Sequence, residues 1–226
     1  MNILPISSLA FGFIMGIKHS FEADHIAAVS TMAVNHKSIK KSTLLGFFWG
    51  IGHTIALLAV ALVILSLKIK IPEKIALSLE LIVAFMLILL GINVLITMKK
   101  KKIHAHKHKH GRENHIHFHS HILNKSHEHK HLHKQSLFVG IIHGLAGSAA
   151  LILIVLASID SVFIGLVYIL IFGAGSLIGM SLISSVISLP LVLIPKKLEI
   201  LNKLIRISSS LISIIIGFVI INQIMF

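Results

Sequence analysis

Long apolar stretches, separated by short basic or proline-containing breaks, constrain this chain more than any other feature of its sequence. A helix needs about 20 apolar residues to cross the hydrocarbon core of a bilayer, and each stretch is long enough to do so. With 55% hydrophobic and only 13% charged residues, the chain fits neither a soluble nor a disordered protein. We therefore predict an all-α, polytopic membrane protein with six transmembrane helices. They are expected near residues 3–34, 43–67, 75–98, 137–159, 162–189 and 207–226.

The basic residues indicate how these helices face the bilayer. Counted over alternate loops, seventeen Lys and Arg fall on one side and only Lys68, Lys70 and Lys74 on the other. Cytoplasmic loops carry the excess of Lys and Arg, so a multi-pass protein of the plasma membrane is predicted, with both termini outside and the 99–135 loop in the cytoplasm. The net charge of +13 is then an orientation signal, and we expect no nucleic acid partner.

The six expected spans divide into two three-helix halves, 1–98 and 136–226, joined by the histidine-rich loop 99–135. Because the halves start on opposite sides of the membrane, this order is compatible with a 3+3 inverted repeat. Glycines spaced four apart let helix backbones approach closely. Close helix contacts are therefore predicted at Gly12/Gly16, Gly46/Gly50, Gly140/Gly144 and Gly175/Gly179.

Ionisable residues interrupt the first apolar stretch, where His19, Asp24 and His25 stand within seven positions. Such groups are costly in hydrocarbon and usually mark a functional site. Imidazole and carboxylate suit divalent Ni, Co, Zn or Cu, and a chain without cysteine has no thiolate ligand to offer. On a regular helix His19 and His25 lie about 120° apart. Either the helix is locally broken, or ligands from other helices complete the site.

A repeated short motif indicates which other helices could supply these ligands. Gly-Ile-x-His occurs three times and ends at His19, His53 and His143, each in a different expected span. His53 and His143 are therefore the candidates to complete the site. The alternatives are that the motif recurs by chance, or that each histidine is neutral and hydrogen-bonded across helices. Glu22 stands four residues after Lys18, the helical spacing of an ion pair, and we expect these two to pair.

The loop 99–135 holds twelve of the seventeen histidines in three quartets with alternate spacing. Alternate residues of an extended chain point to one side, so each quartet is predicted to wrap a transition metal without a prefolded site. Ten Lys or Arg and few apolar residues predict a disordered loop when it is empty. A solvated, expendable linker is the alternative. The quartets are His104, His106, His108 and His110; His115, His117, His119 and His121; and His127, His129, His131 and His133.

Three motifs resemble one known family. His19-x-x-x-x-Asp24-His25-Ile-Ala-Ala resembles the signature of the nickel/cobalt transporter superfamily, and Gly-Phe-Phe-Trp-Gly-Ile-Gly-His53-Thr is similar to its next-helix motif. His143-Gly-Leu-Ala-Gly-Ser-Ala-Ala resembles the shorter six-helix branch of the urease accessory UreH type, where full-length transporters carry Asp and Glu. This resemblance implies that His19, Asp24 and His25 are the transport-essential ligands, with His53 next.

Residues and resemblance together predict a transporter, not an enzyme, whose cargo is Ni²⁺ or Co²⁺ and which holds no permanent cofactor. In the favoured hypothesis it imports the ion through the bilayer, and the loop captures metal for a cytoplasmic metal-handling protein. Two alternatives stay open: an efflux protein whose loop collects metal, or a non-transporting metal buffer or urease or hydrogenase accessory factor. The oligomeric state is left open as well.

Overall fold

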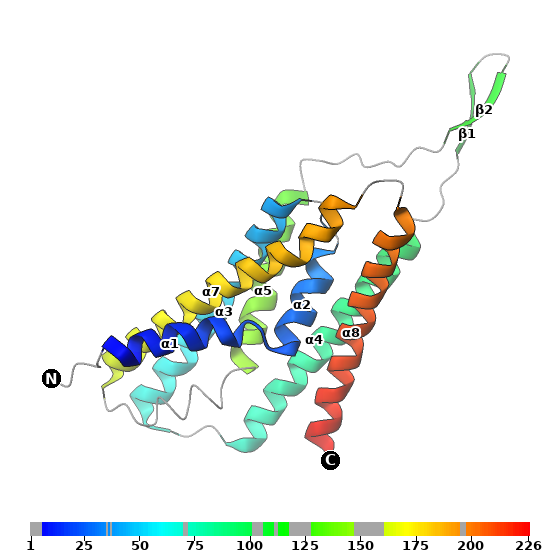
Figure 1. Ribbon diagram of the computed structural model, residues 1–226. Helices are drawn as coiled ribbons and strands as arrows, with labels where there is room; N and C mark the ends of the chain where they lie inside the picture. The colour runs from blue at the N-terminus through cyan, green and yellow to red at the C-terminus, as the bar shows by residue number, and fades with distance from the viewer. Residues whose placement is uncertain are drawn as a thin grey trace.

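The computed structural model describes residues 6–34, 36, 38–69, 72–100, 106–110, 113–117, 128–146, 161–194 and 198–226. Over these residues the chain consists of helices and one antiparallel hairpin, which projects from one end of the bundle (Figure 1). The helices are α1 (Ile6–His19), α2 (Ala23–Ala33), α3 (Ile39–Leu67), α4 (Glu73–Lys100), α5 (Glu128–Ala146), α7 (Val162–Leu193) and α8 (Glu199–Met225). The strands are β1 (His106–His110) and β2 (Glu113–His117).

Among the described residues, four helices are long and apolar enough to cross a membrane, namely α3, α4, α7 and α8. A helical membrane protein is thereby confirmed, whereas six spans and an inverted repeat stay predictions. The first expected span consists of two shorter helices, α1 and α2. The fourth can be followed through α5 only to Ala146, because residues 147–160 lie outside the described part.

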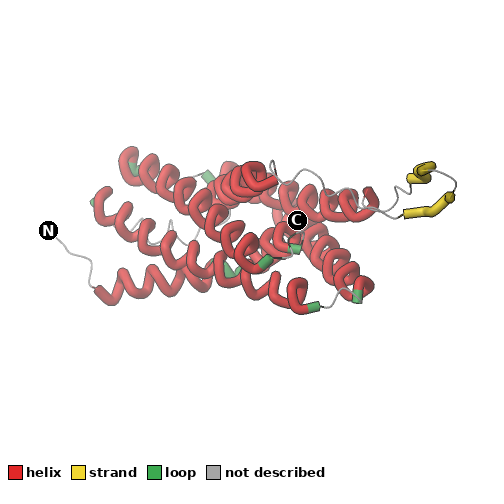
Figure 2. Tube along the Cα trace, turned by 90° about the horizontal axis from the view of Figure 1, so that it is seen from above, coloured by secondary structure: helices red, strands yellow, loops and turns green. Residues whose placement is uncertain are grey.

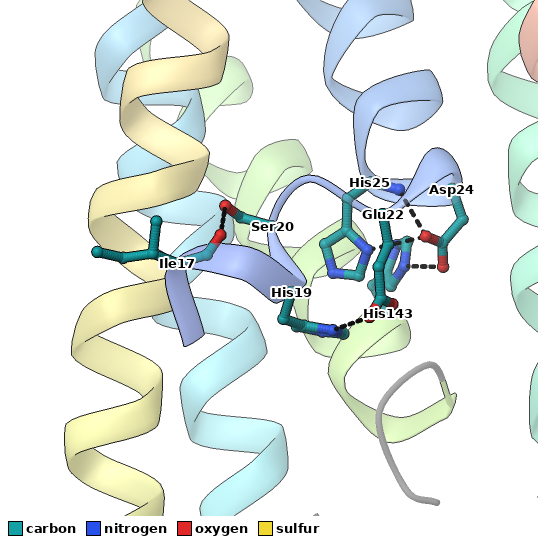
Figure 3. A network of polar contacts seen from close by, with 7 residues as sticks. All are labelled: Ile17, His19, Ser20, Glu22, Asp24, His25 and His143. Atoms are coloured by element: carbon teal, nitrogen blue, oxygen red, sulfur yellow. Dashed lines mark hydrogen bonds and ion pairs between the residues drawn. The ribbon is translucent and has the colours of Figure 1, made fainter. Parts of the chain in front are cut away.

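The break between α1 and α2 is the feature of the fold that builds the site. The chain leaves the helix after His19, and Glu22 has an extended backbone with φ −63° and ψ 150° before α2 begins. The Ser20 hydroxyl donates to the Ile17 carbonyl at 2.6 Å and so satisfies an acceptor at the end of α1 (Figure 3). The first of the two alternatives for this segment is therefore confirmed: the helix is locally broken.

Helix α3 lies at the centre of the packing, between α7 and α5, while α1 packs on α7 and α4 packs on α8. Figure 2, a view from above, shows the helices gathered side by side with the hairpin beyond one end of the group. The core cluster joins α2, α3, α4, α5 and α7, and Trp49 of α3 is its largest fully buried side chain. This packing surrounds the α1–α2 break with helices on several sides.

All four glycine pairs lie at helix contacts, so this prediction is confirmed. A Cβ added to Gly16 of α1 would overlap the Phe172 carbonyl group of α7, and one added to Gly140 of α5 would overlap the carbonyl oxygen of Trp49 on α3. Backbone atoms of a neighbouring helix also lie close to Gly46, Gly50, Gly144 and Gly175, whereas Gly12 meets the Tyr168 ring of α7 and Gly179 meets Ser20 at the end of α1.

Gly16→Val is expected to lower the apparent melting temperature of the protein in detergent by several degrees. The added side chain meets backbone of α7, which cannot rotate away, and overpacking of this kind costs about 1–3 kcal/mol or more. Ala10→Val is the matched control, because Ala10 lies on an exposed position of the same helix. Equal melting temperatures for the two variants would contradict the close α1–α7 contact.

Helices extend into the expected loop at both ends, since α4 continues to Lys100 and α5 begins at Glu128. The domain boundaries at 98/99 and 135/136 therefore fall inside helices, and the division into two halves and a loop stays a prediction.

Candidate metal centre

Four buried histidines from four helices meet at the α1–α2 break. His19 ends α1, His25 lies in the first turn of α2, His53 in α3 and His143 near the end of α5. His19 is 5% exposed and the other three are fully buried. The ring centroids of His19 and His25 are 4.4 Å apart, those of His25 and His143 4.0 Å, and those of His19 and His53 5.3 Å. The fold thus brings together the three histidines of the repeated Gly-Ile-x-His motif.

Two overlapping groups in this cluster have spacings that suit a metal ion. His19, His25 and His53 each offer one ring nitrogen, and these atoms lie within 4.8 Å of one another. Asp24, His25 and His143 form a second group within the same limit. Two nitrogens on one ion at about 2.1 Å, the Zn–N distance, are at most about 4.2 Å apart. Either group therefore needs only a small adjustment to hold an ion, and His25 belongs to both.

The Asp24 carboxylate holds two of the histidines (Figure 3). His25 lies 3.0 Å from Oδ1 through its Nδ1, and His143 lies 2.9 Å from Oδ2 through its Nε2. An ionised carboxylate only accepts hydrogen bonds, so both ring nitrogens donate. In a neutral imidazole the other nitrogen then carries the lone pair. Asp24 thereby leaves Nε2 of His25 and Nδ1 of His143 as the ligand atoms of these rings.

The Glu22 carboxylate orients the ring of His19 as Asp24 orients that of His25. Nδ1 of His19 lies 3.0 Å from Oε1 of Glu22 (Figure 3). The ion pair expected between Glu22 and Lys18 is wrong. That pairing needs a continuous helix across both residues, whereas the helix ends at His19 and the chain turns back. Lys18 is exposed, and the Glu22 carboxylate orients the buried His19 instead.

The nitrogens left over are buried and have no hydrogen-bond partner within the described part of the chain. They are Nε2 of His19, Nε2 of His25, both ring nitrogens of His53, and Nδ1 of His143. An unsatisfied buried polar group costs about 1–3 kcal/mol, so several of them in one place need a ligand. Histidines that bind metal commonly donate their other N–H to a carboxylate, which is the arrangement of His19 and His25 here.

Aromatic rings close the site on two sides. Trp49 of α3 stacks on His25 with centroids 5.5 Å apart and an interplanar angle of 25°. Phe172 of α7 lies 5.5 Å from the His19 ring. Sequence reasoning missed both walls, although Trp49 stands four residues before His53 and so on the same helix face. Apolar walls exclude water and strengthen the electrostatic interactions inside the site.

A family model described as "High-affinity nickel-transport protein", NicO, matches residues 6–226. The chain belongs to the NicO family. It is also 40% identical over 203 residues to "Urease accessory protein UreH" of Bacillus sp. (strain TB-90), an alignment that covers 90% of this chain and 86% of the relative. No solved structure matches significantly. The resemblance to nickel/cobalt transporters is thus confirmed, and this NicO protein is a nickel/cobalt transmembrane transporter, not an enzyme.

The loop histidines of this NicO protein are only partly described. His104, His119, His121 and His127 lie outside the described residues. In the hairpin, His106 pairs with His117 and His108 with His115, while His110 ends β1. The extended conformation expected for the third quartet is wrong for its last three members, His129, His131 and His133, which lie in α5.

Continuation of the α5 helix explains that difference. Glu128 stands in the first turn of α5, where an acidic residue is favoured by the helix dipole, and the helix then runs on into the apolar stretch. Alternate residues of a helix are about 200° apart, so they do not share a side. The His133 ring packs on Phe48 of α3 with centroids 4.4 Å apart. Metal capture by the loop stays a prediction.

Proposed function

We propose that this NicO protein carries Ni²⁺ or Co²⁺ across the plasma membrane through the buried histidine cluster, with His19, His25 and His53 as ligands of the ion. The observation that carries this proposal is the convergence of unpartnered, buried ring nitrogens on rings whose other nitrogen a carboxylate holds. Imidazole nitrogen is a suitable donor for these divalent ions. The ion is cargo, and the site has to bind it and release it again.

In this proposal Asp24 and His143 complete the site around His25. The carboxylate of Asp24, 18% exposed, offsets part of the charge of an ion that has lost its water. His143 has a lone pair on Nδ1 and lies 4.0 Å from His25 between ring centroids. The group Asp24, His25 and His143 also lies within metal-binding distance and shares His25 with the first group. It offers a departing ion a second set of donors once the two rings release the hydrogens that they donate to Asp24.

Import is the direction we propose. The excess of basic residues supports an orientation with the termini outside and the histidine-rich loop in the cytoplasm. A membrane potential of 100 mV, negative inside, contributes about 2.3 kcal/mol per charge, hence about 4.6 kcal/mol for a divalent ion. This corresponds to more than about a thousandfold accumulation without ATP. The Bacillus relative is named a urease accessory protein, and we propose a similar role here, with the loop passing metal to a cytoplasmic metal-handling protein.

Trp49 offers a direct test of ion binding. It is the only tryptophan of the chain and stacks on His25. Ni²⁺ and Co²⁺ have open d shells and quench indole fluorescence at contact distances, whereas Zn²⁺ has a closed d shell. We expect Ni²⁺ to quench the fluorescence of the purified protein saturably, and Zn²⁺ to compete with the quenching.

The matched variant is His25→Ala, in which saturable quenching is expected to be lost. A variant in which a short Gly-Ser linker replaces residues 101–127, between α4 and α5, should be quenched like the wild type. Quenching that persists in His25→Ala, or that disappears when the loop is replaced, would show that the ion does not bind in the buried cluster.

A further inference from the structure

Glu80 is the only charged residue in the apolar part of α4, between Lys74 and Lys99. It lies seven residues after Glu73 and thus about 10.5 Å inside the helix. Its side chain is half-buried and forms no hydrogen bond or ion pair with the described part of the chain. The segment 147–160, which follows α5, contains no Lys, Arg or His that could neutralise it. A carboxylate without a counter-ion is costly at this depth, and such groups usually mark the path of an ion or substrate.

Glu80 lies on the buried face of α4. Leu87 and Val94 follow it at intervals of seven residues, which is two helical turns, and both are buried. Ala84, one turn after Glu80, is buried against α8. The opposite face of the helix carries Leu89, which is largely exposed. The Glu80 carboxylate is therefore on the side of α4 that packs in the bundle, and its partial exposure leaves it within reach of an ion.

The heights of three helices show how Glu80 lies relative to the histidine cluster. Residues of these helices meet at one height near the loop end of the bundle: Thr31 of α2, Leu90 and Val94 of α4, and Ser136 of α5. Asp24 and His143 each lie seven residues, about 10.5 Å, from that height on the side away from the loop. Glu80 lies ten to fourteen residues from it in the same direction, about 15–21 Å. Glu80 is thus about 5–10 Å beyond Asp24 and His143, toward the end opposite the histidine-rich loop.

A single carboxylate at this position attracts a divalent cation without trapping it. Charges set among apolar walls focus the electric field, and such fields raise the rate at which ions arrive by about 10- to 1,000-fold. One carboxylate offers oxygen to an ion that keeps most of its water, whereas the cluster offers the ring nitrogens of His19, His25 and His53. The ion is therefore held weakly at Glu80 and more tightly in the cluster, so that it moves inward.

We propose that Glu80 is the entry-side carboxylate of the ion path, which attracts a hydrated divalent cation and passes it to the buried cluster. This inference rests on the proposed function. In the import orientation the end of the bundle opposite the loop is outside, so an arriving ion meets Glu80 before Asp24 and the histidines. Glu80 then sets the rate at which ions reach the cluster, while the cluster sets how tightly they bind.

The test compares Glu80→Gln with Glu80→Asp in the full chain. Both variants keep a polar side chain of similar size, so we expect both to fold, but only aspartate keeps the charge. The initial rate of ⁶³Ni²⁺ uptake by cells is measured well below half-saturation and per amount of protein in the membrane. We expect this rate to fall about tenfold in Glu80→Gln and less than about threefold in Glu80→Asp.

The matched control is Glu73→Gln, which removes the same charge from an exposed position two turns away on the same helix face. Its rate of uptake should equal that of the wild type. In all three purified variants, saturating Ni²⁺ is expected to quench Trp49 as in the wild type, because the histidines of the cluster are unchanged.

Uptake at the wild-type rate in Glu80→Gln would overturn the proposal. So would equal losses in Glu80→Gln and Glu80→Asp, because charge would then not be the property that matters. Loss of the saturated quenching in Glu80→Gln would overturn it as well, since Glu80 would then act on the buried site itself. A failure of the proposed function shows in a different variant, as normal quenching and normal uptake in His25→Ala.

Discussion

Replacing His25 by alanine is expected to reduce ⁶³Ni²⁺ uptake by cells to the level of cells without the protein. His25 is fully buried, belongs to both candidate ligand groups and stacks on Trp49. Its loss removes one nitrogen from each group and takes an N–H donor from Asp24. No other residue of the site has all of these contacts, so we expect no other single substitution to reduce uptake further.

The uptake of His25→Ala has to be compared with that of the variant in which a Gly-Ser linker replaces residues 101–127. If the buried cluster carries the ion, this variant keeps most of the uptake while His25→Ala loses it. Accumulation below that of control cells, restored by His25→Ala, would reverse the direction to export. Uptake that depends on the loop and not on His25 would favour a metal buffer. Competition by Co²⁺ and Zn²⁺ in the same assay measures selectivity.

The residues that the fold brings together in the candidate site could be predicted from the sequence, because hydrocarbon makes polar residues conspicuous. An apolar stretch contains the ionisable residues His19, Asp24 and His25. The repeated Gly-Ile-x-His motif then identifies His53 and His143 as further candidates. The structure places all five in one cluster. The close helix contacts could be predicted too, because four-residue glycine spacing has one physical use in tightly packed membrane helices.

The partners within the site could not be predicted, because they depend on where the chain bends. Glu22 pairs with His19 only because the helix ends there, and nothing in the spacing of Lys18 and Glu22 reveals the break. The alternate spacing of the third histidine quartet predicts an extended chain. That pattern carries no information on how far α5 extends, and α5 begins at Glu128.

Asp24→Asn is expected to weaken Ni²⁺ binding by about 10- to 100-fold, the usual cost of losing an outer partner of a ligating histidine. The carboxylate accepts the ring N–H of His25 and the backbone N–H of His25 at Oδ1, and the ring N–H of His143 at Oδ2. An amide has one acceptor oxygen and one donor nitrogen, so one of the two rings has to change its tautomer or lose its hydrogen bond. If His25 changes, its lone pair moves to Nδ1, away from the other two nitrogens. Titration of the Trp49 fluorescence with Ni²⁺ measures the loss.

Glu22→Gln is the matched control for this substitution. Glu22 is 43% exposed and holds a single ring, that of His19. The amide oxygen of glutamine can still accept the His19 N–H, so we expect a loss of affinity of less than about fivefold, below the range usual for such partners. An equal loss in both variants would mean that charge alone, and not the choice of tautomer, sets the affinity.

The visible spectrum of bound Co²⁺ separates the two roles that Asp24 can have. If Asp24 only orients His25, Asp24→Asn needs more Co²⁺ to reach saturation, but the saturated spectrum equals that of the wild type because the ligand atoms are the same three nitrogens. If Asp24 is itself a ligand, replacing its oxygen shifts the d–d bands even at saturation. The first result would assign the ion to His19, His25 and His53. The second would assign it to the group formed by Asp24, His25 and His143.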